Sequence, residues 1–279
     1  MSERESPFTL ALIAGGCAGT AVDVALHPLD TLRTRIQSQE GFIASGGFRG
    51  VYRGILSAAM GSAPGAAVFF STYETMKGVF KSLNGGKEEP LHHACASSCG
   101  EVGACAIRVP TAVVTQNMQV GNYNTLTEAV RGTIKNGGMM GFYRGYGTTV
   151  AREIPFAFIQ FPIYEAFKST WASWQGQETN AVQGAACGSI AGAIAGAVTT
   201  PLDVCKTRIM LEKPVEGQPK RYTGTYSTLS TIAKEEGTVA LFKGIGPRVM
   251  WITIGGFIFF GAYEQATRSL FKTRMWDEY

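Results

Sequence analysis

Long apolar stretches rich in small residues alternate with shorter polar stretches along the whole chain. Six of them have the length of long helices, at about residues 8–38, 53–82, 90–120, 144–174, 178–211 and 243–271. Polar segments at 123–138 and 221–237 have an amphipathic pattern that suits a helix lying on a membrane surface. The segment QEGFIASGG at 39–47 is a short and poorly formed version of it. The pattern therefore predicts an all-α protein built from paired long helices.

The composition narrows the class of protein without deciding it. Of the 279 residues, 45% are hydrophobic and only 16% are charged, whereas about a quarter are charged in soluble domains. The mean hydropathy is only +0.06, and no uninterrupted apolar run reaches the ~18 residues of a simple membrane-spanning helix. These values fit either a membrane protein with a wet interior or a soluble bundle rich in glycine and alanine.

The charge and the cysteines argue against several kinds of site. A net charge of +4 without a long basic run is a poor match to nucleic-acid binding. Most of the six cysteines lie in apolar helical stretches, and no histidine pair has zinc-ligand spacing. We therefore expect buried thiols, and neither a disulfide framework nor a metal site. The start, MSERESPF, matches neither a secretory signal nor a transit helix, so any organellar address is expected to be internal.

Three motifs each occur three times and always in the same order. The proline motif is PLDTLRTRIQ at 28, PTAVVTQNMQ at 110 and PLDVCKTRIM at 201. An aromatic-basic-glycine triplet follows at 52–54, 143–145 and 242–244, and a Tyr-Glu motif at 73–77, 164–168 and 263–267. Recurrence at a long fixed period indicates repeated structural units. We predict three repeats, at 1–86, 87–176 and 177–279, each with two long helices.

These three motifs resemble those of the mitochondrial carrier family, and the resemblance covers nearly the whole chain. It implies six transmembrane helices around a pseudo-threefold axis in the mitochondrial inner membrane. It further implies that both termini face the intermembrane space, that the short helices lie in the matrix, and that a monomer suffices. Cardiolipin is expected near the triplets, at Arg53, Gly54, Arg144, Gly145, Lys243 and Gly244.

The charged residues of the proline and Tyr-Glu motifs predict two gates. A charge at membrane depth costs roughly 2.5–3.5 kcal/mol on the insertion scale, so such residues face water or one another. The predicted matrix gate comprises Asp30, Arg33, Gln37, Asp203 and Lys206, and the cytosolic gate Glu74, Lys77, Glu165, Lys168 and Glu264. Proline bends the helices inward at the matrix gate. The expected pairs are Asp203–Arg33 in the matrix gate and Glu74–Lys168 and Glu264–Lys77 in the cytosolic gate, with Glu165 facing Thr267.

The second proline motif lacks every charged residue of the other two. Its charged positions are occupied by Ala112, Thr115 and Asn117. Asp30 and Lys206 are therefore expected to lose their partners, while Gln37 and Gln119 brace the remaining contacts by hydrogen bonds. We expect a weakened matrix gate and a population shifted toward the matrix-open state.

Helical phase places a further set of charged residues on the same side of their helices as the gates. The set comprises Asp23, Glu101, Arg108, Arg152 and Glu153. For any one of them a structural ion pair is the alternative, but the whole set predicts a charged, water-filled cavity. Gly61 and Trp251 lie at the positions equivalent to the Arg152–Glu153 pair, and Phe70 is one of the aromatic residues nearby.

The charges of this cavity indicate the kind of substrate. Arg152 offers a planar fork for a carboxylate, and Glu153 can meet an ammonium group. Two more acids, Asp23 and Glu101, favour a substrate with extra positive charge. Aromatic faces suit a flat ring or an onium group. By themselves, these features leave lysine, ornithine and S-adenosylmethionine open.

Four longer segments are similar to those of the family members that carry S-adenosylmethionine. They are AGTAVDVALHPLDTLRTRIQS, GEVGACAIRVP, REIPFAFIQFPIYE and MWITIGGFIFFGAYE. The similarity implies exchange of cytosolic S-adenosylmethionine for matrix S-adenosylhomocysteine. The implied contacts are Asp23 and Glu101 for the sulfonium or amino groups, Arg152 and Glu153 for the amino-acid end, and Gly61 and Trp251 for the adenine.

Three other functions compete with this one. A carrier of another basic amino acid or of a nucleotide would have the same fold. A methyltransferase would share the ligand, but the chain has neither an alternating strand–helix series nor a suitable glycine-rich loop. A scaffold that transports nothing has no need for acids at membrane depth. We therefore predict a solute transporter, an antiporter without catalytic residues, cofactor or metal.

Overall fold

The computed structural model describes residues 5–83, 90–212, 221–256 and 258, and every regular element in these ranges is helical. The elements are α1 (Glu5–Gln37), α2 (Gly41–Ala44), α3 (Ile55–Leu83), α4 (Pro90–Gln119), α5 (Leu126–Gly137), η1 (Met139–Tyr143), α6 (Tyr146–Gln175), α7 (Ala181–Val198), α8 (Thr200–Leu211), α9 (Thr225–Glu235) and η2 (Thr238–Phe242). Residues 245–256 are also helical. The predicted all-α class is confirmed, and the two amphipathic segments form α5 and α9.

The third proline motif breaks its helix. The pattern predicts one helix at 178–211, but α7 and α8 are separate and meet at an angle of 64°. Pro201, in the first turn of α8, has no backbone N–H and its ring would clash with the preceding turn, so the helix is interrupted there. By contrast, α1 and α4 each continue as one helix through Pro28 and Pro110.

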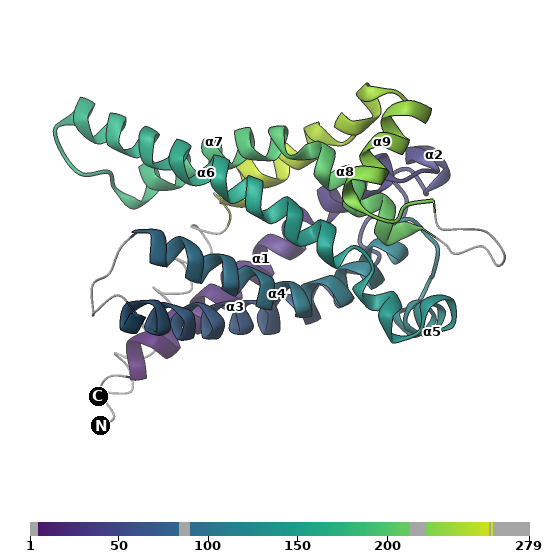
Figure 1. Ribbon diagram of the computed structural model, residues 1–279, viewed down its shortest axis with the longest axis horizontal. Coiled ribbons are helices and arrows are strands. Elements are labelled where there is room, and N and C mark those ends of the chain that lie inside the picture. The colour runs from purple at the N-terminus through teal and green to yellow at the C-terminus, as the bar shows by residue number, and fades with distance from the viewer. Residues whose placement is uncertain (1–4, 84–89, 213–220, 257, 259–279) are drawn as a thin grey trace.

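The long helices pack in chain order and close into a ring. α1 contacts α3, α3 packs along α4, α4 contacts α6, and α6 packs along α7. Residues 245–256 close the ring, because Gly256 adjoins Ser189 of α7 and Gly255 adjoins Leu26 of α1. In Figure 1 the α3–α4 and α6–α7 pairs spread apart at one end, while α2, α5, α8 and α9 gather at the other. We call this second end the proline-motif end.

Glycines allow the α3–α4 pair to approach closely. A Cβ on Gly100 would lie 3.0 Å from the backbone oxygen of Phe69, and one on Gly103 would lie 3.0 Å from the hydroxyl of Thr72. Such contacts are typical of helices that pack in a membrane, where small residues let two backbones approach.

Length and apolar composition single out few membrane spans. Within the described residues, Ile55–Leu83 qualifies alone, and Val182–Val198 with Thr200–Leu211 qualify together as one bent span. The six-helix arrangement therefore has to be inferred from helix packing and recurrent motifs.

Candidate functional site

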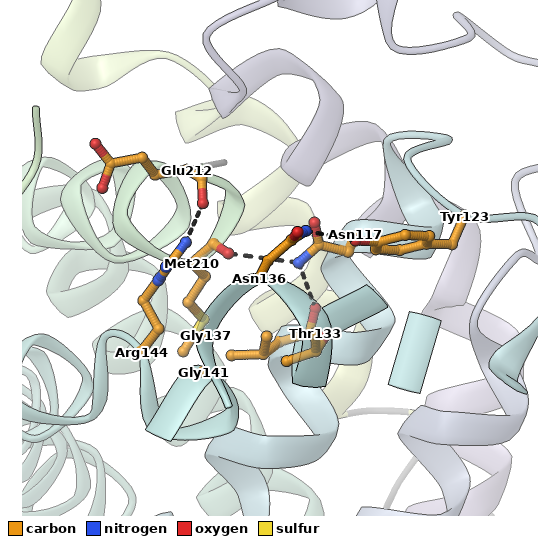
Figure 2. A pocket seen from close by; sticks show the side chains of 10 residues that line it. Asn117, Tyr123, Thr133, Asn136, Gly137, Gly141, Arg144, Met210 and Glu212 are labelled. Carbon is orange, nitrogen blue, oxygen red and sulfur yellow. Dashed lines mark hydrogen bonds between the residues drawn. The ribbon is translucent and has the colours of Figure 1, made fainter. Parts of the chain in front are cut away.

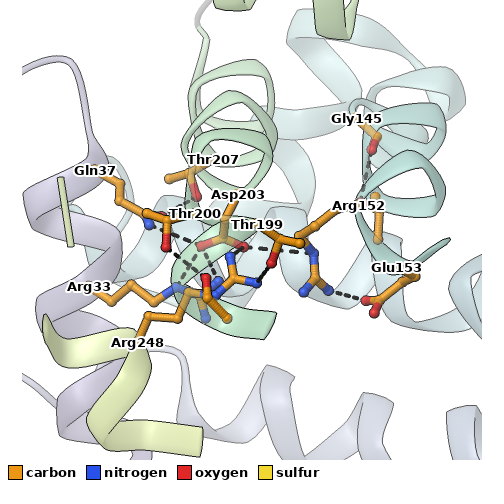
Figure 3. A network of polar contacts seen from close by, with 12 residues as sticks. Arg33, Gln37, Gly145, Arg152, Glu153, Thr199, Thr200, Asp203, Thr207 and Arg248 are labelled. Carbon is orange, nitrogen blue, oxygen red and sulfur yellow. Dashed lines mark hydrogen bonds and ion pairs between the residues drawn. The ribbon is translucent and has the colours of Figure 1, made fainter. Parts of the chain in front are cut away.

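Asp203, at the start of α8, is the centre of an ion network at the proline-motif end. Its side chain is 1% exposed. Arg33 of α1 donates from Nε to Asp203 Oδ2 at 2.7 Å, and Gln37 donates to the same oxygen at 3.0 Å. Arg248 lies 3.1 Å and Arg152 lies 3.7 Å from Asp203 Oδ1 (Figure 3). One buried acid thus joins α1, α6, α8 and residues 245–256, and the predicted Arg33–Asp203 contact is present.

The expectation for Asp30 needs correction. Asp30 has no basic partner in the second motif, but Gln119 donates to its Oδ2 at 2.8 Å. Arg33 of the same helix lies 3.7 Å from Asp30 Oδ1. Asp30 therefore keeps an amide partner from α4, because Gln119 is long enough to replace the missing base. Lys206 forms no ion pair within the described residues, as the sequence predicts.

Side chains near the C-terminal ends of α1, α4 and α8 also bind the next of these three helices around the ring. Arg35 donates to the backbone carbonyl of Gln119 at 2.7 Å, and Arg208 donates to that of Gln37 at 2.6 Å. In the second motif the equivalent residue is Asn117, which donates to a carbonyl of α8 at 3.4 Å. Both arginines are 1% exposed, so their guanidinium groups are held inside the protein by these contacts.

A small cavity of about 30 Å³ lies beside Asn117 (Figure 2). It is bounded by the ends of α4 and α8 and by α5 and η1, with Asn136 and Arg144 in its lining. The Arg144 guanidinium donates to the backbone carbonyl of Glu212. This volume is enough for water but not for an organic substrate.

Four of the five predicted cavity charges lie together. Glu101 pairs with Arg108 on α4, and Arg152 pairs with Glu153 on α6. Glu101 also interacts electrostatically with both Arg152 and Glu153, so the two pairs form one cluster. Asp23 lies apart from it: the groups that interact electrostatically with its carboxylate are Ser62 of α3 and Asp30 and His27 of its own helix. The structure therefore groups the α4 and α6 charges but does not connect Asp23 to them.

The predicted adenine contacts do not join this cluster. Gly61 is buried, and a Cβ there would overlap Thr111 of α4, so this glycine serves helix packing and leaves no room for a base. We correct that assignment. Trp251 is half-buried in the helical stretch 245–256. Phe70 is 53% exposed and packs edge-on against Phe69, with ring centroids 5.4 Å apart.

The predicted cytosolic pairs are not formed at the opposite end within the described residues. Glu74 and Glu165 are exposed. Lys168 does not reach Glu74; its ammonium lies 5.7 Å from the ring centre of Tyr164. Lys77 forms no ion pair with a described residue, and its predicted partner Glu264 lies outside the described residues. In this conformation the polar network of the proline-motif end is therefore assembled and the Glu74–Lys168 pair is open.

The glycines of the three triplets directly precede α3, α6 and the helical residues 245–256, and each adopts a left-handed conformation. Gly145 and Gly244 both have φ of 79°, which favours glycine. A Cβ on Gly244 would lie 3.1 Å from Gln37 Cγ, so the triplet backbone also touches the next helix around the ring. The predicted lipid contacts Arg53, Gly54 (φ 84°) and Lys243 lie at the same turns, and Lys243 donates to Glu236 at 3.0 Å.

A model of the family described as "Mitochondrial carrier protein" matches residues 4–84, 86–173 and 177–274. This chain belongs to the mitochondrial carrier family. It is 48% identical over 270 residues to the "Mitochondrial S-adenosylmethionine carrier protein" of Danio rerio, covering 97% of this chain and 100% of the relative. Similarity to the protein of the same name in Mus musculus is 48% over 263 residues, covering 94% and 95% of the two chains. The "S-adenosylmethionine mitochondrial carrier protein homolog" of Drosophila melanogaster is 46% identical over 269 residues, covering 95% and 94%.

Family membership makes this carrier a mitochondrial solute transporter rather than an enzyme and confirms the resemblance found in its motifs. The six-helix fold of the family agrees with the ring of helices described above.

Sequence analysis missed two residues of this carrier's polar network. Arg248 is 1% exposed and donates to the Thr199 hydroxyl at 2.7 Å, besides its contact with Asp203. The sequence feature that could have identified Arg248 is its position as a single arginine in an apolar stretch, one turn before Trp251. Glu236 receives both terminal nitrogens of Arg208, at 2.7 and 2.8 Å. Desolvation raises the pKa of Glu236, but hydrogen bonds from Arg208 and Lys243 outweigh it, so the pKa lies below its ordinary value.

Proposed function

We propose that this carrier exchanges cytosolic S-adenosylmethionine for matrix S-adenosylhomocysteine across the mitochondrial inner membrane. The observation that carries the proposal is the position of Arg152, which contacts both Glu153 and the network acid Asp203. A substrate carboxylate that binds Arg152 would compete with both acids. Substrate binding at the charged cluster would therefore weaken the Arg152–Asp203 contact at the proline-motif end. The choice of substrate is supported by near full-length similarity to proteins named S-adenosylmethionine carriers.

The cluster suits a zwitterion that carries one more positive charge. Arg152 would hold the substrate carboxylate as a planar fork, and Glu153 would hold its ammonium group. Glu101, with Arg108 beside it, would face the sulfonium. Asp23 remains part of the proposal as a second acid on the opposite wall, and Trp251 and Phe70 as aromatic lining. Because S-adenosylhomocysteine lacks the sulfonium charge, the acids would discriminate between the two exchanged molecules.

Alternating access would follow from two gates of similar strength. The Asp203 network would close the matrix end, and the Tyr-Glu motifs would close the cytosolic end once the matrix end opens. The assembled network and the open Glu74–Lys168 pair are consistent with a state open to the cytosol. In this scheme the carrier works as a monomer and both of its termini face the intermembrane space. The helices α5 and α9 lie on the matrix surface. Cardiolipin would bind the basic residues of the triplets, Arg53, Arg144 and Lys243.

Uptake into liposomes tests the proposal. Purified carrier is reconstituted with internal S-adenosylhomocysteine, and radiolabelled S-adenosylmethionine is supplied outside. We expect saturable uptake that requires the internal substrate. Lysine, ornithine and ADP are added as competitors, because the same charged cluster would also fit a basic amino acid. If any of these competes better than S-adenosylhomocysteine, the substrate assignment is wrong and the alternative carrier function takes its place.

The role of Asp23 has its own test in the same assay. Asp23→Asn keeps the size of the side chain and its contact with Ser62 but removes the charge. We expect uptake of S-adenosylmethionine to be abolished. Near-normal uptake would remove Asp23 from the substrate site and leave the α4 and α6 cluster as its only charged part.

A further inference from the structure

A second, larger cavity of about 570 Å³ lies between α6, α7 and residues 245–256. Its volume falls within the range of about 300–1,000 Å³ that is typical of small-molecule sites. The α6 side contributes Gln160, Phe161, Tyr164 and Lys168, while Ser189 and Ile252 line the other two sides. None of the roles assigned so far uses this cavity, apart from the predicted gate residue Lys168.

The cavity offers flat apolar surfaces. The Tyr164 ring lies against α7, where a Cβ on Gly184 or Gly188 would be 3.7 to 3.8 Å from its atoms. Phe161 is 58% exposed, so a ring face is open to a ligand. The Tyr164 ring already occupies the space over these glycines, so the exposed Phe161 ring is the flat surface on which a planar group can stack in an offset or edge-on arrangement.

The cavity also contains polar groups without protein partners. The Ser189 hydroxyl is buried, with 4% of the residue exposed, and has no hydrogen-bond partner in the described structure. A buried hydroxyl without a partner is costly, so such a group in a cavity lining indicates a ligand or water. The Gln160 amide makes no hydrogen bond with any described residue, and its nitrogen would lie 3.5 Å from a Cβ on Gly192. An amide carries one donor and one acceptor side, which match the N6 and N7 edge of adenine.

The position of the cavity matches the charged cluster. Gln160 follows Glu153 by seven residues, which is two helical turns, so both side chains lie on the same face of α6. The rise between them is about 10 Å. An adenosyl amino acid has its base and its amino-acid group at opposite ends, joined by a ribose and a short chain. One extended molecule would therefore reach from Arg152 and Glu153 to Gln160.

We propose that this cavity is a nucleoside subsite, in which the Gln160 amide and the Ser189 hydroxyl bind the adenosine part of the substrate. The inference rests on the proposed transport function and places the base on α6 and α7, away from Gly61. Both exchanged molecules carry the same adenosine, so the subsite binds the part that they share. The charged cluster binds the sulfonium, which only S-adenosylmethionine carries. Lysine and ornithine have no group for the subsite, which gives a physical reason for discrimination against them.

Gln160→Met is the decisive variant, because methionine keeps the length of the side chain and removes its hydrogen bonds. Inhibition of labelled S-adenosylmethionine uptake is measured with S-adenosylhomocysteine and with S-methylmethionine, a sulfonium amino acid without adenosine. We expect Gln160→Met to weaken inhibition by S-adenosylhomocysteine about tenfold, as expected for one lost hydrogen bond in a buried site. Inhibition by S-methylmethionine is expected to stay unchanged. Equal weakening of both inhibitors, or of neither, would overturn the subsite.

Ser189→Ala provides a second variant, with Ser169→Ala as its control, since Ser169 is exposed on α6 and does not line the cavity. Only Ser189→Ala is expected to weaken S-adenosylhomocysteine selectively. Thermal unfolding of the wild-type carrier with adenosine separates this inference from the proposed function. If S-adenosylmethionine is not transported, stabilisation by adenosine that Gln160→Met removes would uphold the subsite and reject only the function. No stabilisation in that case would reject both.

Discussion

The ends of α8 and α4 occupy equivalent places in the chain but are held by different chemistry. At the end of α8, Arg208 donates to the backbone carbonyl of Gln37 in α1. It also forms a bidentate ion pair with Glu236, the residue that follows α9. At the end of α4, the equivalent residues are Asn117 and Gly137. The amide of Asn117 replaces the guanidinium with a single longer contact of 3.4 Å to α8.

The difference teaches that the arginine and its acid are present or absent together. A buried charge without its partner is strongly unfavourable, whereas loss of both partners leaves only a small space. At α4 that space is the cavity of about 30 Å³ beside Asn117 (Figure 2). The neighbouring basic residue follows the same rule, since Lys243 donates to Glu236 while Arg144 turns to a backbone carbonyl.

The end of α1 shows a third arrangement. Arg35 is buried and pairs with no acid among the described residues; its guanidinium donates to the backbone carbonyls of Gly47 at 2.5 Å and Arg49 at 2.8 Å. The backbone carbonyls of the loop after α1 thus accept the hydrogen bonds of Arg35, as the Glu236 carboxylate does for Arg208. Charged and neutral contacts are therefore distributed unequally around the ring, with the ions concentrated on Asp203 and α8.

The largest effect is expected from Asp203→Ala. This change leaves Arg33 and Arg248 without their shared acid, which should cost about 3–5 kcal/mol of folding stability. Thermal unfolding of the detergent-solubilised carrier measures the effect, with Asp203→Asn as the variant that keeps the shape. An unfolding temperature equal to that of the wild type would show that the ion network does not hold the helices together.

Conversion of the α8 end into the α4 type is expected to have the next largest effect. Glu236→Gly alone leaves Arg208 buried with one carbonyl partner and should cost about 1–3 kcal/mol. Adding Arg208→Asn should recover part of that loss, because the pair is removed as a unit. Glu235→Gly, at the neighbouring exposed pair with Arg221, is the matched control and should have a small effect. Strictly additive losses for the double variant would contradict this coupling.

The reverse conversion adds the ion pair to α4. A Cβ on Gly137 would have no contact closer than 3.8 Å, to Arg144, so a glutamate fits there. Asn117→Arg with Gly137→Glu should stabilise the carrier by about 1 kcal/mol, which raises the unfolding temperature by about 2–4 °C. Asn117→Arg alone should lower it, because the new charge is buried beside Arg144. The idea fails if the double variant is as unstable as the single one.

A smaller effect is expected from Ala112→Glu, which offers an acid to the unpaired Lys206. A hydrated pair contributes about 1 kcal/mol or less, enough to shift the gate several-fold toward the cytosol-open state. Labelling of a cysteine introduced on the cytosolic side measures the shift, with Ala112→Gln as the uncharged control. Thr115 is best left unchanged, since its hydroxyl lies 2.7 Å from that of Ser57. Identical labelling of the two variants would reject a charge effect.

The smallest effect is a dependence on pH that only the α8 end should show. The pKa of Glu236 in the folded carrier is below its ordinary value of 4.5, so its contribution to stability is present above pH 4.5. That contribution is lost as the pH falls through the lower folded value. Unfolding temperatures of the wild type and Glu236→Gln should therefore differ at pH 7 and converge only well below pH 4.5, where the folded carboxylate also becomes protonated, for example at about pH 3. Parallel curves would show that the Glu236 pair adds no pH-dependent stability.

Several features of the fold were predictable from the sequence because they depend on local patterns. The apolar stretches predicted helix positions close to those of α1, α3, α4 and α6, because helical periodicity depends only on residues that are close together in the chain. The break at Thr199 was missed because Pro28 and Pro110 occur in the same motif without breaking their helices. Whether a proline kinks or interrupts a helix depends on how the neighbouring turns pack.

The candidate site was predictable only in part. Helical phase put Arg152 and Glu153 on the inner face of α6, and the proline motifs gave the Arg33–Asp203 contact. The hydrogen bond from Gln119 to Asp30 was underestimated, because the reach of a glutamine between two helices depends on their separation. Gly61 was misassigned because a glycine in the sequence fits a cavity wall and a close helix contact equally well, and only the structure shows that Thr111 packs against it.

The sequence by itself determined the helical class, the recurrence of three motifs and which positions carry charge, since these properties need only spacing along one chain. Only the tertiary structure decided which partners those charges have. Arg248 and Arg152 meet Asp203 because three helices converge on one point, and no periodicity within a single helix specifies that convergence. A buried ion takes whichever opposite charge lies within a few ångströms, and that distance is fixed by packing.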